Sequence, residues 1–239
     1  MTNERTTLLI GEENAKKLQD ATVLVVGTGG VGGMAVESLA RSGVGCLILI
    51  DRDIVEASNT NRQLAALTDT VGEAKVQVLA DRIHRIDPAI HVIPIHEYYD
   101  RDMNERLDAL HPDFVLDCID SLRAKEDLIE YCTTRKIPFV SSMGMARRRD
   151  PSRLGICELE KTAGDPLAKR LRIWRRKQGI RETVRVCCSS ELPGPAEAGS
   201  PLPSMMFVPA AAGLIMAAEC VQVLTEAETG RTSKERKYN

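Results

Sequence analysis

The sequence predicts an α/β fold, with a Rossmann-like, mostly parallel sheet, helices on both of its faces and a carboxyl-terminal extension of mixed strands and helices. Short apolar runs rich in Val and Ile alternate with longer segments whose apolar residues recur at helical spacing. This alternation is typical of parallel strands that are buried on both faces. A glycine-rich turn follows the first apolar run, and the 239 residues suffice to bury a substantial core in one large domain.

The expected elements follow this alternation along the chain. We predict strands at 22–27, 46–51, 91–96, 114–119 and 138–142, and helices over 31–41, 74–86 and 122–136. Such βαβ units imply a doubly wound sheet with right-handed crossovers. Beyond residue 145 we predict a strand near 154–158, a basic amphipathic helix from about 166, a strand near 183–188 and an exposed loop rich in Pro and Gly over 193–203.

The apolar run over 205–224 has the length of a membrane-spanning helix. Pro209 and Glu219 interrupt this run, and its small residues suit close packing against a sheet. We therefore expect a buried strand and helix here, without stable membrane insertion. The amino terminus lacks the long apolar core of a secretory signal, so we expect a cytoplasmic protein.

The composition excludes several classes of protein. Hydrophobic residues make up 43% of the chain, charged residues make up 28%, and the net charge is −2, which is ordinary for a soluble protein and unlike a disordered or strongly basic one. The seven cysteines lie mostly in apolar runs and form no CxxC pair. We therefore predict small buried hydrophobes in a reducing compartment and no structural zinc.

A nucleotide site is indicated where the first predicted strand ends. Gly27, Gly29, Gly30 and Gly32 form a glycine turn between that strand and a helix, the context in which backbone amides and a helix amino terminus bind phosphate. Asp51 closes the next strand, where a carboxylate can accept hydrogen bonds from ribose hydroxyls. NAD-binding domains share all of these features.

The segment after the second strand favours ATP over NAD. Arg62 lies in the sequence SNTNRQ, and Lys75 begins the following helix. Hydride transfer needs neither cation, whereas displacement at an α-phosphate builds negative charge that Arg and Lys stabilise. Asp117 and Asp120 lie at the end of the fourth strand, near the same edge of the sheet, where a carboxylate can hold Mg²⁺ against a triphosphate.

Together these motifs resemble the superfamily of ubiquitin-activating enzymes and their bacterial relatives that adenylylate ThiS- and MoaD-like sulfur carriers. The resemblance implies that Arg62 and Lys75 contact the triphosphate of ATP and that Asp120 coordinates Mg²⁺. It further implies that Asp51 holds the ribose. Supporting contacts to the nucleotide are implied for Asp53, Asn59 and Gln63, and a contact to ATP across a dimer interface for Arg5.

Three further segments narrow the resemblance. Residues 5–11, 161–167 and 188–191 are similar to the tRNA threonylcarbamoyladenosine dehydratase family, so the likeness covers nearly the whole chain. It implies adenylylation of the threonyl carboxylate of N6-threonylcarbamoyladenosine (t6A) at position 37 of tRNA, followed by ring closure to the cyclic form with loss of AMP. In this reading 1–145 is the ATP-binding half of a single ThiF-type domain, 146–225 is its substrate-side half, and 226–239 is a flexible tail.

Charge is segregated in a way that suits an RNA substrate. Residues 147–185 hold thirteen Lys or Arg against five Asp or Glu, a charge of +8, while the remainder carries −10. The predicted helix from 166 has an apolar side of Leu167, Leu171 and Trp174. We take these basic residues as candidates for contacts to tRNA: Arg147, Arg148, Arg149, Lys169, Arg172 and Arg176.

The sequence departs from relatives in two places, and several alternatives stay open. Pro201 to Ser204 occupy the place where some dehydratases have a cysteine, which argues against a covalent thioester. The absence of CxxC argues against sulfur-carrier activation, although adenylylation of the carboxyl-terminal glycine of a ThiS- or MoaD-like protein remains the main alternative. An NAD-dependent oxidoreductase and a non-catalytic scaffold are the others. The resemblance to the superfamily implies a homodimer, and a sulfurtransferase or sulfur acceptor stays open as a partner.

Overall fold

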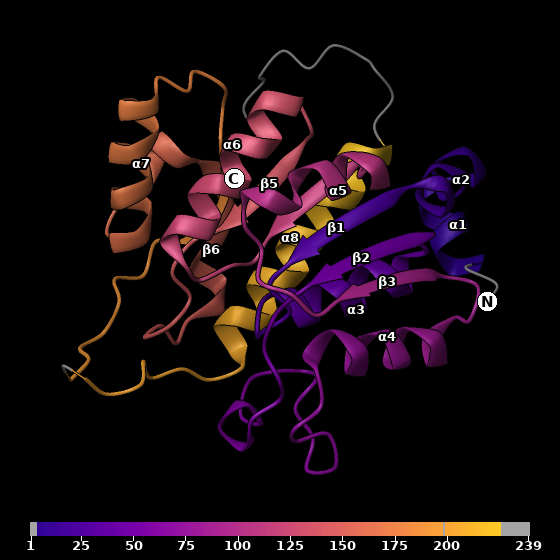
Figure 1. Ribbon diagram of the computed structural model, residues 1–239, viewed down its shortest axis with the longest axis horizontal. Coiled ribbons are helices and arrows are strands. Elements are labelled where there is room, and N and C mark those ends of the chain that lie inside the picture. The colour runs from indigo at the N-terminus through magenta and orange to yellow at the C-terminus, as the bar shows by residue number, and fades with distance from the viewer. Residues whose placement is uncertain (1–3, 198, 226–239) are drawn as a thin grey trace.

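The computed structural model describes residues 4–197 and 199–225, which build a seven-stranded sheet with helices on both faces (Figure 1). The strand order is β3-β2-β1-β4-β5-β7-β6, with β6 antiparallel to β7 and every other neighbouring pair parallel. The strands are β1 (Thr22–Val26), β2 (Cys46–Ile50), β3 (His91–Ile95), β4 (Phe114–Asp117), β5 (Phe139–Ser142), β6 (Leu154–Glu158) and β7 (Arg185–Ser189). The predicted fold class is thereby confirmed.

The helices are α1 (Glu4–Ile10), α2 (Glu12–Asp20), α3 (Gly32–Ser42), α4 (Lys75–Ile86), α5 (Asn104–Leu110), α6 (Leu122–Arg135), α7 (Pro166–Gln178) and α8 (Phe207–Thr225). Short 3-10 helices span Ala57–Asn59, Arg101–Met103, Pro151–Arg153 and Leu159–Lys161. The sequence predicted α3, α4, α6 and α7 but assigned no helix to α1, α2 or α5. The predicted flexible tail, 226–239, lies outside the described residues.

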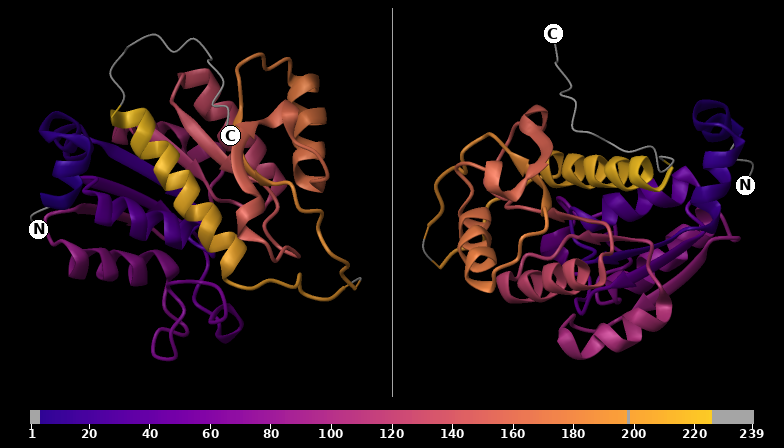
Figure 2. Two further views of the ribbon diagram at one scale, coloured as in Figure 1. Left: turned by 180° about the vertical axis from the view of Figure 1, so that it is seen from behind. Right: turned by 90° about the horizontal axis from the view of Figure 1, so that it is seen from above.

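Alternate side chains of the strands build a core on each face of the sheet. Val23 and Val25 of β1 pack with α3, α4 and α8 on one face, whereas Leu24 and Val26 pack with α5 and α6 on the other. Figure 2 shows α8 lying across the first of these faces. Because both faces are covered, the central strands are apolar along their whole length, which is why the sequence predicted them as parallel.

The strand predicted within 205–224 is wrong, because a single helix, α8, occupies this segment. Pro209 is the third residue of α8, where the missing N–H interrupts no helical hydrogen bond. Glu219, the other expected interruption, forms an ion pair with Arg185 of β7 at 2.7 Å. The segment is long and apolar enough to cross a membrane by length and composition alone, yet Val208, Ala212 and Met216 are fully buried in the protein core.

A third small core lies beneath α7. Leu171 and Ala168 of α7 are fully buried against Ile129 of α6 and Val186 of β7. Leu167 and Trp174 are half-buried at the edge of the same cluster, so the predicted apolar side of this basic helix is confirmed. Figure 1 shows α7 at the side of the molecule away from α1, and Lys169, Arg170 and Arg176 on its other side are exposed.

Candidate active site

A cavity of about 740 Å³ opens where β1, β2, β4 and β5 end. This edge of a doubly wound sheet is where such folds bind ligands. The cavity brings together most residues that the sequence singled out for the nucleotide. Those that line it are Gly27, Gly29, Gly30, Asp51, Asp53, Arg62, Gln63, Lys75 and Asp120.

The glycine turn connects β1 to α3 under tight steric limits. Gly27 has φ 86°, and a Cβ there would lie 2.8 Å from the carbonyl oxygen of Cys118. A Cβ on Gly32 would lie 1.8 Å from the carbonyl oxygen of Gly27, so this glycine permits the sharp turn without lining the cavity. A Cβ added to Gly29 would lie no closer than 3.7 Å to any neighbour, the nearest being the Gln63 side chain. The backbone at Gly29 is therefore open to a ligand such as a phosphate group.

Asp51 is held against this turn. The backbone N–H and the hydroxyl of Thr28 donate to Asp51 Oδ2 at 2.7 and 2.9 Å, and the Asp53 N–H donates to Oδ1 at 2.9 Å. Thr28 is fully buried, so the carboxylate has one fixed orientation at the end of β2. Sequence reasoning identified Asp51 but missed the part that Thr28 plays in positioning it.

The two predicted cations both reach the cavity, in different settings. Lys75 is only 4% exposed, and its Nζ lies 2.8 Å from Asp53 Oδ2. Arg62 is half-buried, and its Nη1 donates to the carbonyl of Ser58 and to Asn61 Oδ1, each at 2.9 Å. Both cations are thus held by oxygen atoms at the cavity wall, where negative charge on a ligand would be stabilised.

Two polar side chains in the cavity lack partners within the described part of the chain. Gln63 Oε1 is buried and accepts no hydrogen bond there, a costly arrangement that a hydroxyl or amino donor on a ligand would relieve. Asp120 is exposed at the rim and forms no hydrogen bond or ion pair with a described residue. ATP fits this donor and acceptor set because it offers ribose and adenine donors alongside its anionic phosphates.

Beneath the cavity lies a fully buried ion pair that the sequence did not predict. Lys125 Nζ of α6 lies 2.8 Å from Asp117 Oδ1, and both side chains are 0% exposed. Ser141 of β5 donates from its hydroxyl to Asp117 Oδ2 at 2.6 Å and accepts from Lys125 Nζ at 3.1 Å. Asp117 also accepts from the Ile119 N–H at 3.2 Å. This network fixes the start of the loop that carries Asp120.

Besides Gly32, two predicted nucleotide contacts do not line the cavity. Asn59 is buried and does not line the cavity; its side chain accepts from the Glu56 N–H at 3.3 Å and caps a 3-10 helix, so it supports the loop and not the nucleotide directly. Arg5 is exposed on α1, and Figure 1 shows α1 near the start of β1, whereas the cavity lies where the strands end. Arg5 therefore cannot serve the cavity of its own chain.

The six basic residues that the sequence proposed for contacts to tRNA differ in how far they are buried. Arg148 is 3% exposed, and its Nη2 lies 2.7 Å from Asp165 Oδ2, so its assignment to an RNA-binding surface is corrected. Arg172 is half-buried and donates to the hydroxyl and carbonyl oxygens of Thr162. Arg147 lines the cavity. The remaining three are exposed: Arg149, Lys169 and Arg176.

All seven cysteines are free thiols; Cys132, Cys187 and Cys220 are buried as predicted, and the other four are half-buried. Burial raises the pKa of Cys118, which lines the cavity, and raises those of Cys187 and Cys188 to about 12. Thiols with raised pKa values are poor nucleophiles at neutral pH. Among the described residues, no three His, Cys, Asp or Glu side chains gather as a metal site would require.

Substituting Gly32 by alanine is expected to lower the free energy of unfolding by about 1–3 kcal/mol and to weaken ATP binding, because the added methyl group must displace the Gly27 carbonyl. Thermal unfolding and calorimetric titration with ATP measure the two effects. Gly155→Ala is the matched control, since a Cβ there meets nothing within 4 Å. Equal behaviour of the two variants would contradict the steric role of Gly32.

Comparison with known proteins places these features in a family. The sequence pattern of the ThiF family matches residues 3–239. The tRNA threonylcarbamoyladenosine dehydratase of Bacillus subtilis (strain 168) is 41% identical over 236 residues, which cover 92% of this chain and 93% of the relative. The molybdopterin-synthase adenylyltransferase of Salmonella typhimurium is 42% identical over 129 residues, which cover 54% of this chain and 51% of the relative.

Solved structures agree with the sequence matches. The crystal structure of E. coli tRNA N6-threonylcarbamoyladenosine dehydratase, TcdA, in complex with AMP superposes with a TM-score of 0.87 at 35% identity, covering 92% of each chain. Its complex with ATP superposes with a TM-score of 0.86 at the same identity and coverage. In sequence alignment the match spans 62% of the Escherichia coli enzyme. With the family pattern spanning nearly its whole length, the chain belongs to the ThiF family.

Proposed function

We propose that this protein is an ATP-dependent tRNA threonylcarbamoyladenosine dehydratase, which converts t6A37 of tRNA to its cyclic form. The observation that carries the proposal is a single cavity that unites the glycine turn, Arg62, Lys75 and Asp120 with the substrate-side half of the chain. Support also comes from relatives of this name that match the chain over nearly its full length.

The first step activates a carboxylate. An oxygen of the threonyl carboxylate attacks the α-phosphorus of ATP, and pyrophosphate leaves with the electrons of the broken P–O bond. Arg62 and Lys75 stabilise the negative charge that builds on the phosphoryl oxygens. Asp51 holds the ribose, with Asp53 and Gln63 supporting. Hydride transfer with NAD would not require either of these two cations.

Asp120 is the residue that would hold Mg²⁺ at the rim of the cavity, since it is exposed there and its carboxylate has no partner among the described residues. A magnesium ion bound there would neutralise the triphosphate and favour departure of pyrophosphate. Asp53 is less suited to this task because Lys75 already pairs with it at 2.8 Å.

The second step closes a ring within the modified side chain. A heteroatom of the carbamoyl group attacks the activated carbonyl carbon, and AMP leaves with one former carboxylate oxygen. The nucleoside therefore loses one water in total. Because nucleophile and electrophile belong to one substituent, the step gains from proximity and needs no nucleophilic side chain. The raised pKa of Cys118 agrees with a mechanism free of a thioester.

The basic residues that remain accessible are proposed to contact tRNA phosphates. Arg149 and Lys169 are exposed and their side chains form no ion pair with a described residue. Arg176 is 68% exposed but lies 2.8 Å from Glu160. Phosphate contacts of this kind position an RNA without reading its sequence, so we expect recognition of the modified base to occur within the cavity.

We propose a homodimer in which Arg5 reaches the cavity of the partner subunit. Leu8 and Leu9 of α1 are 80% and 85% exposed, and Leu214 of α8 is 48% exposed. Apolar side chains this accessible favour burial against a second surface. The division into halves at 145, the cytoplasmic location and a sulfurtransferase or sulfur-acceptor partner stay predictions.

Incubating the protein with ATP, Mg²⁺ and tRNA carrying t6A is expected to yield a nucleoside lighter by one water, together with AMP and pyrophosphate. Mass spectrometry of the digested tRNA makes the measurement, and unmodified tRNA is the control. Pyrophosphate exchange that requires a ThiS- or MoaD-like protein while t6A tRNA stays inert would instead establish the sulfur-carrier alternative.

A further inference from the structure

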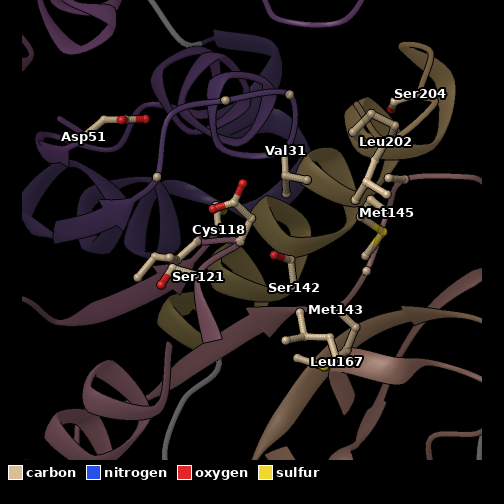
Figure 3. Close-up of a pocket in the computed structure, with 18 of the residues that line it drawn as sticks. Val31, Asp51, Cys118, Ser121, Ser142, Met143, Met145, Leu167, Leu202 and Ser204 are labelled. Carbon is tan, nitrogen blue, oxygen red and sulfur yellow. The ribbon is translucent and has the colours of Figure 1, made fainter. Parts of the chain in front are cut away.

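The cavity has a second end that the nucleotide motifs do not account for. We call it the acceptor lobe and define it by Met143, Met145, Arg147, Leu167, Pro201 and Leu202. Figure 3 shows Asp51 on one side of the cavity, and Met143, Met145, Leu167 and Leu202 gathered on the other. Apart from Arg147, these side chains are apolar, so the lobe suits a flat, weakly polar group.

The wall of the lobe is fixed by a buried ion pair. Asp165 accepts at Oδ2 from Arg148 Nη2 at 2.7 Å and from the Gly144 N–H at 3.1 Å, and at Oδ1 from the Ala168 N–H at 2.9 Å. The pair therefore joins the segment after β5 to the start of α7. Leu167 and Met145 are thereby held at set positions, as a preformed binding site requires.

Backbone hydrogen bonds of Arg147 fix the opposite wall of the lobe. Its N–H donates to the carbonyl of Pro203 and its own carbonyl accepts from the Gly194 N–H, each at 2.8 Å. Arg147 adopts φ 63°, a left-handed conformation that costs a non-glycine residue energy and recurs at ligand sites. The segment that carries Pro201 and Leu202 is thus anchored over the lobe.

On the basis of the proposed function, we infer that the acceptor lobe binds the purine base of t6A37 after the base has turned out of the anticodon loop. Only about five covalent bonds of roughly 1.4 Å separate the purine ring from the threonyl carboxylate. When the threonyl carboxylate lies at the α-phosphate, the purine ring must therefore also lie within the cavity.

The chemistry of the lobe matches this occupant. Thioether and aliphatic side chains pack well on the face of an aromatic ring, as Met145 and Leu202 would. Turning out a base costs least in a single-stranded loop, where no pair has to be broken. Arg147 in the lobe and the exposed Arg149 that follows it supply positive charge for the flanking phosphates.

The free nucleoside t6A tests the inference, because it carries the base without the tRNA backbone. In the wild-type protein it is expected to inhibit cyclisation of t6A tRNA competitively, at a concentration at least about tenfold below that of N-carbamoylthreonine, which lacks the purine. Equal inhibition by the two compounds would overturn base binding.

A pair of leucine variants separates the lobe from the rest of the site. Leu202→Ala is expected to raise the inhibition constant of the nucleoside and the KM for t6A tRNA by about tenfold, with calorimetric ATP affinity unchanged. Leu202 is 61% exposed, so its truncation threatens folding little; Leu192→Ala is the control, since Leu192 is 71% exposed in the same segment and does not line the cavity.

If the two variants behave alike while the wild-type protein cyclises t6A tRNA, the inference is overturned and the proposed function stands. If the wild-type protein cyclises no t6A tRNA at all, the proposed function fails first and the inference falls with it. Met145→Ala tests a buried residue of the lobe by the same inhibition constant and KM. Circular dichroism verifies that this variant is folded.

Discussion

Arg62→Ala and Asp120→Ala are each expected to lower kcat for AMP formation by about 10²–10³, with folding unaffected. In the proposed mechanism each side chain acts on charge that develops at the phosphates, and removal of one such preorganised group has about this effect. Among the described residues, Arg62 donates only to the Ser58 carbonyl and to Asn61, and Asp120 has no partner. Neither truncation strands a buried charge, so the loss is expected in catalysis and not in stability.

AMP release from t6A tRNA, followed as a function of Mg²⁺ concentration, measures both variants. Asp120→Ala should also raise the Mg²⁺ concentration for half-maximal rate, whereas Arg62→Ala should not. Arg85→Ala and Asp69→Ala are matched controls, because both residues are exposed and neither lines the cavity. Full activity of Arg62→Ala and Asp120→Ala would refute the assignment of the site.

The strands were predictable because burial on both faces leaves a direct trace in the sequence. Residues 23–26 and 47–50 are buried without exception, so their apolar runs lack the alternation of a half-exposed strand. The start of α8 was not predictable in this way. A short apolar run ahead of Pro209 fits a strand end and a first helical turn equally well, and only packing against α3 and the sheet decides between them.

The convergence of the proposed nucleotide residues was predictable for a topological reason. In a parallel sheet the segments after successive strands meet at one edge, so Gly27, Asp51 and Asp120 had to converge. The acceptor lobe was not predictable, because Arg148 and Asp165 meet only in the folded chain. The count of basic residues along the sequence made Arg148 a candidate for contact with tRNA at the surface. The structure shows that its guanidinium group is buried.

Charge counting also overstated the free positive charge of α7. Arg175 and Arg176 both bind the carboxylate of Glu160, at 2.9 and 2.8 Å. Hydrogen bonds from Arg176 and then Arg175 lower the pKa of Glu160 despite its partial burial. Two of the arginines on this helix are thus partly neutralised within the chain, which leaves Lys169 and Arg149 as the stronger candidates for phosphate.

Lys125 did leave a signal in the sequence. It lies on the same stripe of α6 as Ile129 and Cys132, which are fully buried. A lysine on an apolar helical stripe requires a buried anionic partner, because an isolated buried charge is costly. Asp117, in a strand predicted to be buried on both faces, is the partner that the fold supplies.

Lys125→Met is therefore expected to lower the free energy of unfolding by about 3–5 kcal/mol, because it leaves the Asp117 carboxylate buried with only neutral donors. Urea unfolding makes the measurement. Lys16→Met is the matched control: its ion pair with Asp20 is 65% and 61% exposed, and such pairs contribute about 0–1 kcal/mol.

The double variant Lys125→Met with Asp117→Asn distinguishes the buried charge from the lost packing. Asparagine keeps an oxygen for the Ile119 N–H but carries no charge, so the double variant should recover a large part of the stability that Lys125→Met loses. Because Asp117 fixes the loop that carries Asp120, Lys125→Met should also weaken the response of AMP formation to Mg²⁺. A loss no greater than that of Lys16→Met would show that the buried pair does not stabilise the floor of the cavity.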